Sequence, residues 1–300
     1  MTITKKIGAS ISALILGVSL AACGTDEDTS GGESESTDLG TITLGFVPSW
    51  TDGLSTAYLL DNQLTEMGYT VEMEEIGDAA LIYAALSEGD VDMYPSAWPE
   101  VTHAEYMKTY GDQIEDVGAY YDNAKLTWAV PEYMDINSIE ELKGMGDEFD
   151  GKVIGIEPGA GLTKASLESV IPEYELDGEY ELVTSSTPAM LAELKKATDA
   201  EESIVVTLWK PFWANAAFPV KTLEDPKGAL GDSEALHFLG KSDFSEEYPE
   251  AAEWIEALKL DDAQYGSLED TVVNEFGEGK EKEAITAWIE ENPDVLPATS

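Results

Sequence analysis

Arginine is absent from this chain of 300 residues, and all 16 of its basic residues are lysines. They face 61 aspartates and glutamates, which gives a formal net charge of -45. A surface this acidic repels nucleic acid and anionic lipid, so we expect no nucleic-acid partner. In molar salt the Debye length falls to about 3 Å, which screens the repulsion among these charges. We interpret the composition as adaptation to a salty environment. The alternative is an ordinary acidic extracellular protein.

Cysteine occurs once, at Cys23, which excludes a disulfide framework and a thiolate metal cluster. It ends the sequence Leu-Ala-Ala-Cys, which resembles a bacterial lipobox, and it follows an apolar run over 7–20 that two lysines precede. This order predicts a lipoprotein signal peptide over 1–22, with Cys23 lipidated as the mature N-terminus. The apolar run is too short for a permanent membrane span.

The next segment has almost no apolar side chains. Residues 24–39 are acidic and of low complexity, so they cannot bury enough surface to fold. With the lipidated cysteine, they predict a disordered tether over 23–40. Export, a lipid anchor and a tether together predict an extracytoplasmic protein held at the cell membrane.

Catalytic motifs are also lacking. The chain has two histidines, His103 and His237, and neither Gly-x-Ser-x-Gly nor His-Glu-x-x-His. The stretch 159–164 lacks the third glycine of a dinucleotide fingerprint and the Gly-Lys pair of a Walker loop. We therefore predict a protein without cofactor, metal or enzymatic activity. A secreted α/β hydrolase stays as a remote alternative that would have only these two histidines as histidine bases.

What the chain does contain, from Thr41 onward, is an alternation of strand and helix patterns, which is typical of an α/β fold with largely parallel sheets. The predicted strands are 41–47, 70–75, 91–94, 126–131, 152–156, 180–184, 203–208, 219–222 and 235–239. The predicted helices are 53–67, 78–88, 100–109, 137–143, 161–170, 187–196, 246–259, 262–275 and 279–290. So many strands fit two modest sheets better than one. We predict one lobe from 41–123 plus 219–300 and a second lobe from 124–218.

Three tryptophans lie where predicted strands end. Trp50, Trp98 and Trp209 each follow a short run of strand-forming residues. Ligands of α/β sheets bind at the carboxyl ends of strands, so aromatic side chains there predict a ligand cage. Trp254 and Trp288 instead lie in amphipathic helical patterns, and we predict that both belong to the core.

An anion site is predicted beside the tryptophans. The turn over 156–163 joins a strand to a helix, and its glycines let a ligand approach the free N–H groups of the helix start. His103 follows Trp98 by five residues and offers a further donor. The alternatives are a plain strand-to-helix turn and an ordinary helix histidine. Indole faces suit a quaternary ammonium group, so cage and anion site together predict a trimethylammonium zwitterion.

In these features the chain resembles the glycine betaine-binding subunit of osmoprotectant ABC importers. The stretches that carry the resemblance are Ser-Ala-Trp-Pro-Glu-Val-Thr-His (96–103), Val-Ile-Gly-Ile-Glu-Pro-Gly-Ala-Gly-Leu-Thr-Lys (153–164), Ser-Ser-Thr-Pro-Ala-Met (185–190) and Ile-Val-Val-Thr-Leu-Trp-Lys-Pro-Phe-Trp (204–213). With their spacing they cover most of 41–260. The resemblance implies a two-lobed, periplasmic-binding-protein-like α/β fold of type II with its ligand in the interlobe cleft.

The resemblance also implies roles for individual residues. In that family three tryptophans form a prism around the trimethylammonium group, and these fall on Trp50, Trp98 and Trp209. The carboxylate clamp of the family falls on His103 and on the backbone amides of Gly161 and Leu162. The implied partners are glycine betaine and the permease of an ABC importer.

Two residues leave alternatives open. Asp52 follows Trp50 by two residues, as in choline-binding relatives that lack the histidine matching His103, and both residues are present here. Asp52 either contacts the cation or caps the helix that follows it. Trp128 is either a fourth wall of the cage or part of the core or hinge. Choline or carnitine is therefore the alternative ligand.

The charge predicts salt-dependent stability. The melting temperature should rise by several degrees between dilute buffer and molar salt, because salt screens the repulsion among the surface carboxylates. Thermal unfolding followed by circular dichroism at constant pH measures this. A melting temperature that does not rise would contradict the interpretation as salt adaptation.

Overall fold

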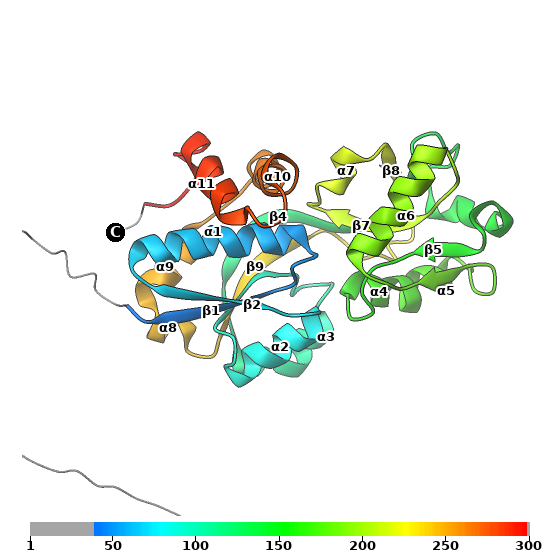
Figure 1. Ribbon diagram of the computed structural model, residues 1–300. Helices are drawn as coiled ribbons and strands as arrows, with labels where there is room; N and C mark the ends of the chain where they lie inside the picture. Colours follow the sequence, from blue (N-terminus) through cyan, green and yellow to red (C-terminus); the bar gives the residue numbers. More distant parts are fainter. Residues whose placement is uncertain (1–38, 299–300) are drawn as a thin grey trace, which may run out of the picture. The chain divides into compact units, whose positions relative to one another are not determined.

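Nine strands form one mixed sheet in the computed structural model, which describes residues 39–298 (Figure 1). The signal peptide over 1–22, the lipidated Cys23 and nearly all of the tether over 23–40 lie outside the described residues and stay predictions. The strands are β1 (Thr41–Phe46), β2 (Thr70–Glu75), β3 (Met93–Ala97), β4 (Ile114–Pro131), β5 (Lys152–Ile154), β6 (Glu181–Val183), β7 (Val206–Lys210), β8 (Val220–Thr222) and β9 (Glu234–Lys241). They follow the order β2-β1-β3-β9-β4-β7-β5-β6, and β8 pairs with β4.

Strand β4 connects the two halves of this sheet. Its first part, up to Ala124, pairs antiparallel with β9, and its second part, from Lys125, pairs antiparallel with β7. β9, β3, β1 and β2 complete the first lobe, while β7, β5 and β6 complete the second, and β1–β2, β1–β3, β5–β6 and β5–β7 are parallel pairs. The two predicted sheets are therefore one sheet, because a single long strand runs through both halves.

The short strand β8 lies on the side of the second lobe, since its residues pair with 129–131 of β4. The return to the first lobe follows in the segment between Thr222 and Glu234. There the Asp225 carboxylate accepts hydrogen bonds from the backbone N–H groups of Ala229 and Leu230, at 3.0 and 2.7 Å. The exact lobe boundaries stay a prediction.

The helices cover the parallel strands, as parallel pairing requires. They are α1 (Thr51–Met67), α2 (Ala79–Glu88), α3 (Ala104–Tyr110), α4 (Gly161–Ala165), α5 (Ile171–Glu173), α6 (Thr187–Ala200), α7 (Ala214–Ala217), α8 (Phe244–Glu247), α9 (Pro249–Ala257), α10 (Asp262–Asp270) and α11 (Glu281–Glu291). The π-helical segments Ser166–Val170 and Thr271–Phe276 continue α4 and α10. Figure 1 shows α10 and α11 packed beside α1, and α4, α5 and α6 around the second lobe.

Helix starts follow local capping rules. The Asp78 side chain accepts the N–H of Leu81 at α2, and Asp261 forms a capping box with Gln264 at α10. Buried leucines of α1 pack on Ile42 and Leu44 of β1 in the core. No helix among residues 39–298 is long and apolar enough to cross a membrane.

Sequence and structure differ in three elements. Strand β4 begins at Ile114, twelve residues before the predicted start at 126, because irregularities in its pairing with β9 break the alternation of apolar residues. The predicted helix 137–143 is one short 3-10 turn over Ile139–Leu142. The predicted helix 246–259 divides at Tyr248, where Pro249 starts α9.

Candidate functional site

A cavity lies where loops of both lobes meet, with about 350 Å³ of space not filled by atoms. The first lobe contributes Trp50, Asp52, Trp98, Thr102 and His103, and the second contributes Leu126, Ile156, Ala160, Gly161, Leu162 and Trp209. Seven of the eight predicted ligand-binding residues line this cavity, and Trp128 does not. Residues that are 159 positions apart in the sequence, such as Trp50 and Trp209, thus share one site.

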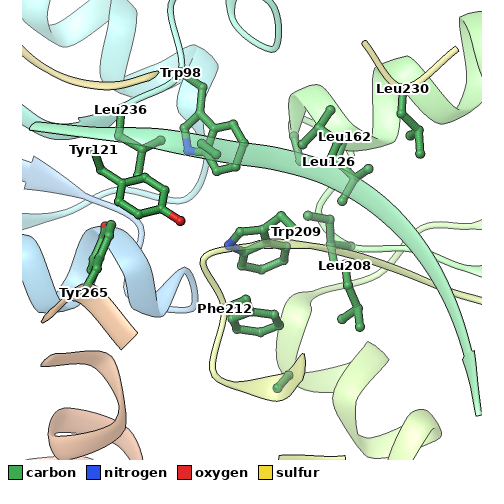
Figure 2. Packing of buried hydrophobic residues seen from close by; sticks show 14 of the residues in the cluster. Trp98, Tyr121, Leu126, Leu162, Leu208, Trp209, Phe212, Leu230, Leu236 and Tyr265 are labelled. Carbon is green, nitrogen blue, oxygen red and sulfur yellow. The ribbon is translucent and has the colours of Figure 1, made fainter. Parts of the chain in front are cut away.

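The tryptophans are held in place by other groups. The ring of Trp209 stacks on that of Phe212, with centroids 3.9 Å apart and planes 13° from parallel. In Figure 2, Phe212 lies on one side of Trp209 and Trp98 on the other. The indole N–H of Trp50 donates to the Glu157 carboxylate at 3.0 Å. Trp50 and Trp209 therefore have defined orientations.

His103 is a neutral hydrogen-bond donor at this site. Its Nδ1 accepts the backbone N–H of Trp98 at 3.2 Å and lies 3.3 Å from the Tyr83 hydroxyl. An Nδ1 that accepts leaves the proton on Nε2. Burial lowers the pKa of His103 to about 3, so the ring stays uncharged at physiological pH. His103 can therefore offer an N–H to an anion without bringing a full charge into the cavity.

Backbone donors face His103 from the second lobe. Gly161 and Leu162 begin α4, and the first N–H groups of a helix have no acceptor within it. The turn before them is fixed by the Thr163 hydroxyl, which donates to the carbonyl of Glu157 at 2.8 Å. A carboxylate between these amides and His103 would receive donors from both lobes.

Gly161 is in close contact with the first lobe. A Cβ atom at this position would lie 2.3 Å from Cγ2 of Thr102 and 2.6 Å from the Thr102 carbonyl oxygen. Only glycine lets the two loops approach this closely. The predicted role of the glycine-rich turn thus extends to the contact between the lobes.

Glu234 positions the loop that carries His103. Its buried carboxylate accepts the backbone N–H groups of Glu100, Val101 and Thr102, at 3.1, 2.9 and 2.9 Å, and the Thr102 hydroxyl. Glu234 begins β9, so it joins this loop to the end of the return segment. Among 61 acidic residues, no local pattern distinguishes Glu234.

Asp52 faces the cavity and does not occupy the N-cap position, which belongs to Trp50. Its Oδ2 accepts the Ser96 hydroxyl at 2.9 Å, while its buried Oδ1 has no hydrogen-bond partner within residues 39–298. Burial raises the pKa of Asp52 to about 6, although Ser96 and Trp209 act in the opposite direction. Nearby, burial raises the pKa of Glu269 to about 8, and the Thr51 hydroxyl donates to this carboxylate.

Trp128 belongs to the core. It is fully buried, and its indole N–H donates to the Ser166 hydroxyl at 2.9 Å. The side chains of Leu126 and Trp128 point to the same face of β4, but only Leu126 reaches the cavity. Trp254 and Trp288 are also buried, which confirms that prediction, and His237 lies on β9 in an ion pair with Asp116.

Comparison with known proteins identifies related chains. Residues 40–291 match the family model of the substrate-binding domain of ABC-type glycine betaine transport systems. The glycine betaine/carnitine transport binding protein GbuC of Listeria monocytogenes serotype 1/2a (strain 10403S) is 35% identical over 156 residues, which are 51% of this chain. The match spans half of the length of that relative, 50%.

Solved structures are similar over more of the chain. The glycine/betaine/L-proline-binding protein ProX of Borrelia burgdorferi has a TM-score of 0.79 and 31% identity, over 86% of this chain and 97% of its own. Lactococcal OpuAC, in its closed conformation with glycine betaine, has a TM-score of 0.78 and 28% identity, over 85% and 96%. These neighbours confirm the predicted two-lobed fold, and the family confirms a binding protein in place of a hydrolase.

The Thr102–Gly161 contact predicts that Gly161→Ala holds the lobes apart. Overpacking of this kind costs about 1–3 kcal/mol, so the closed form should become a minor species. Small-angle X-ray scattering should then give a larger radius of gyration than for the wild type. Gly77→Ala is the matched control, because a Cβ there meets no atom within 4 Å. Equal radii for the two variants would contradict this role of Gly161.

The buried acids predict that stability falls as pH rises. The pKa of Glu269 is about 8 in the folded protein and has an ordinary value of 4.5. The folded state therefore binds this proton more tightly, and its stabilising effect is lost as the pH rises through about 8. The proton on Asp52 stabilises the folded state in the same way, and this effect is lost as the pH rises through about 6.

Melting temperatures across the range from about pH 6 to about pH 9 test this, in molar salt to screen the surface charge. The wild type should lose stability as the pH rises, and Glu269→Gln should lose less because residue 269 no longer titrates. The same slope in both proteins would show that Glu269 does not titrate in this range.

Proposed function

The chain belongs to the family of substrate-binding domains of ABC-type glycine betaine transport systems, and we propose that it binds glycine betaine in the cavity between its lobes. The observation that carries the proposal is the convergence of three tryptophans, His103 and the start of α4 on one cavity. The trimethylammonium group would lie among the faces of Trp50, Trp98 and Trp209. The carboxylate would accept hydrogen bonds from Nε2 of His103 and from the amides of Gly161 and Leu162.

The interactions are of sufficient strength for such a ligand. Each desolvated cation–π contact contributes about 0.5–2 kcal/mol, and each hydrogen bond to a charged acceptor about 1.5–3 kcal/mol. Micromolar affinity needs about -8 kcal/mol. Contributions of this size from both cage and clamp are comparable to this value before the cost of closing the lobes is subtracted.

The polar groups of the cavity are arranged for binding. Thr102 has the only hydroxyl group among its lining residues, and this hydroxyl donates to Glu234. The neighbouring His103 accepts hydrogen bonds at Nδ1 from a backbone amide and Tyr83, so it does not activate Thr102 as a nucleophile. The captured ligand would leave unchanged.

The proposal extends to the place of the protein in the cell. The chain would be exported, anchored to the membrane through a lipid on Cys23, and would deliver its ligand to the permease of an ABC importer driven by a separate ATPase. Accumulation of glycine betaine would serve osmoprotection. The acidic composition fits this role, because a salty medium is where such a solute is needed.

Choline is a second candidate because of Asp52. A carboxylate that lines the cavity with one unpartnered oxygen would stabilise a cation that lacks a carboxylate of its own. With glycine betaine, the same carboxylate would lie near the ammonium end. Carnitine shares both charged groups of glycine betaine but needs more space between them.

Calorimetric titration with glycine betaine and with choline distinguishes these ligands. We expect glycine betaine to bind with micromolar affinity, and His103→Ala to raise its Kd about 10- to 100-fold, since one charge-assisted hydrogen bond is lost. The Kd for choline, which has no carboxylate, should change by less than about threefold in His103→Ala.

His237→Ala is the control, because it removes the other histidine, which lies outside the cavity. Its affinity for glycine betaine should match that of the wild type. If choline binds the wild type far more tightly than glycine betaine does, the proposed carboxylate clamp is wrong.

A further inference from the structure

The Glu157 carboxylate links the two lobes beside the cavity without lining it. It lies in the loop between β5 and α4, and its residue is only 9% exposed. The loop around it supplies cavity walls at Ile156 and Ala160, whereas the Glu157 side chain extends toward the first lobe. Glu157 can therefore influence the cavity only through residues that it contacts, such as Trp50.

Four donors surround this carboxylate, two from each lobe. Oε1 accepts the Ser49 hydroxyl at 3.0 Å and the Thr187 backbone N–H at 2.9 Å. Oε2 accepts the Trp50 indole N–H at 3.0 Å and the Thr187 hydroxyl at 2.9 Å. Each oxygen thus has one donor from its own lobe and one from the opposite lobe.

This arrangement couples the carboxylate to closure. A buried carboxylate needs several donors, and none of the ion pairs within residues 39–298 includes Glu157. Thr187 belongs to the same lobe as Glu157 and stays beside it when the lobes separate. Ser49 and Trp50 belong to the first lobe, so separation would remove one donor from each oxygen.

Trp50 is the residue through which this link affects the site. Its ring lines the cavity, and the single N–H of that ring donates to Glu157. An indole has only one N–H, so this bond determines how the ring is turned. The first lobe supplies the wall, but the second lobe sets its orientation.

We infer that Glu157 is a positioning residue that orients Trp50 only when the lobes are closed, and so retains the ligand by slowing dissociation. This inference rests on the proposed binding of glycine betaine. Closure would complete the cage, and a complete cage would favour closure. The alternative is a purely structural role, in which Glu157 only anchors the start of α6 through Thr187.

Indole resonances test the link without any ligand. The chain has seven tryptophans, and the variant Trp50→Phe identifies the N–H signal of Trp50 in a nitrogen–proton correlation spectrum. In Glu157→Gln this signal should shift upfield, because a neutral amide replaces the carboxylate acceptor. Small-angle scattering should show a larger radius of gyration. Glu168→Gln is the control, since it removes the same charge from an exposed site of the second lobe.

Binding kinetics test the consequence. With glycine betaine, Glu157→Gln should raise Kd about 10-fold or more, mainly through faster dissociation. Ser49→Ala, which removes one donor to Glu157, should raise the Kd for glycine betaine about threefold. This variant serves as the test if Glu157→Gln does not fold. In a double-mutant cycle, Trp50→Phe should raise the Kd for glycine betaine by a smaller factor in the Glu157→Gln background than in the wild type.

The outcomes separate the two proposals. If the wild type binds glycine betaine but Glu157→Gln binds within twofold of it, or the two substitutions are additive, the positioning role is wrong and the function stands. If the wild type binds no quaternary ammonium compound while the Trp50 signal and radius respond to Glu157→Gln, the link between lobes stands and the proposed function fails. If the wild type binds no quaternary ammonium compound and neither the Trp50 signal nor the radius responds to Glu157→Gln, both proposals fail.

Discussion

Buried carboxylates held by uncharged donors are the interaction on which the rest of this site depends. Glu157 orients Trp50, Glu234 holds the loop that carries His103, and Asp52 faces the cavity itself. None of the three is in an ion pair among residues 39–298. Hydroxyl, indole and backbone N–H groups satisfy Glu157 and Glu234 instead, as burial of a charge requires, whereas Asp52 has the Ser96 hydroxyl at one oxygen and no partner within residues 39–298 at the other.

This choice of donors fits the charge of the molecule. Ion pairs between exposed groups weaken as salt screens them, whereas hydrogen bonds to a buried carboxylate are screened much less. Some of the ion pairs, such as Lys195 with Asp199, are exposed, Lys241 with Asp92 is largely buried, and none of the pairs among residues 39–298 includes a residue that lines the cavity. The acidic surface can thus respond to salt while the geometry of the cavity stays the same.

Much of this arrangement could be predicted from the sequence, for reasons that differ between residues. Trp50 and Trp98 follow β1 and β3, and Trp209 is the last residue but one of β7; strand ends meet at one edge of a sheet, so their convergence follows from topology. The glycine-rich turn before α4 is a local signal as well. Neither the interlobe contact of Glu157 nor the contact of Glu234 with the loop that carries His103 could be predicted, because Ser49, Trp50 and that loop are more than 100 residues away from them and the chain is full of similar acids. The first part of β4 was missed because its irregular pairing hides the period of two.

The strand shared by both lobes also limits how such a protein can be assembled from parts. An exchange of either lobe with that of another protein would join two half-strands near Ala124, in the middle of a continuous pairing. A slip of one residue would turn Leu126 away from the cavity and Trp128 out of the core, since successive side chains of a strand alternate between faces. An exchange of lobes would therefore have to preserve this register, whereas substitutions in the loops at the ends of the strands leave it unchanged.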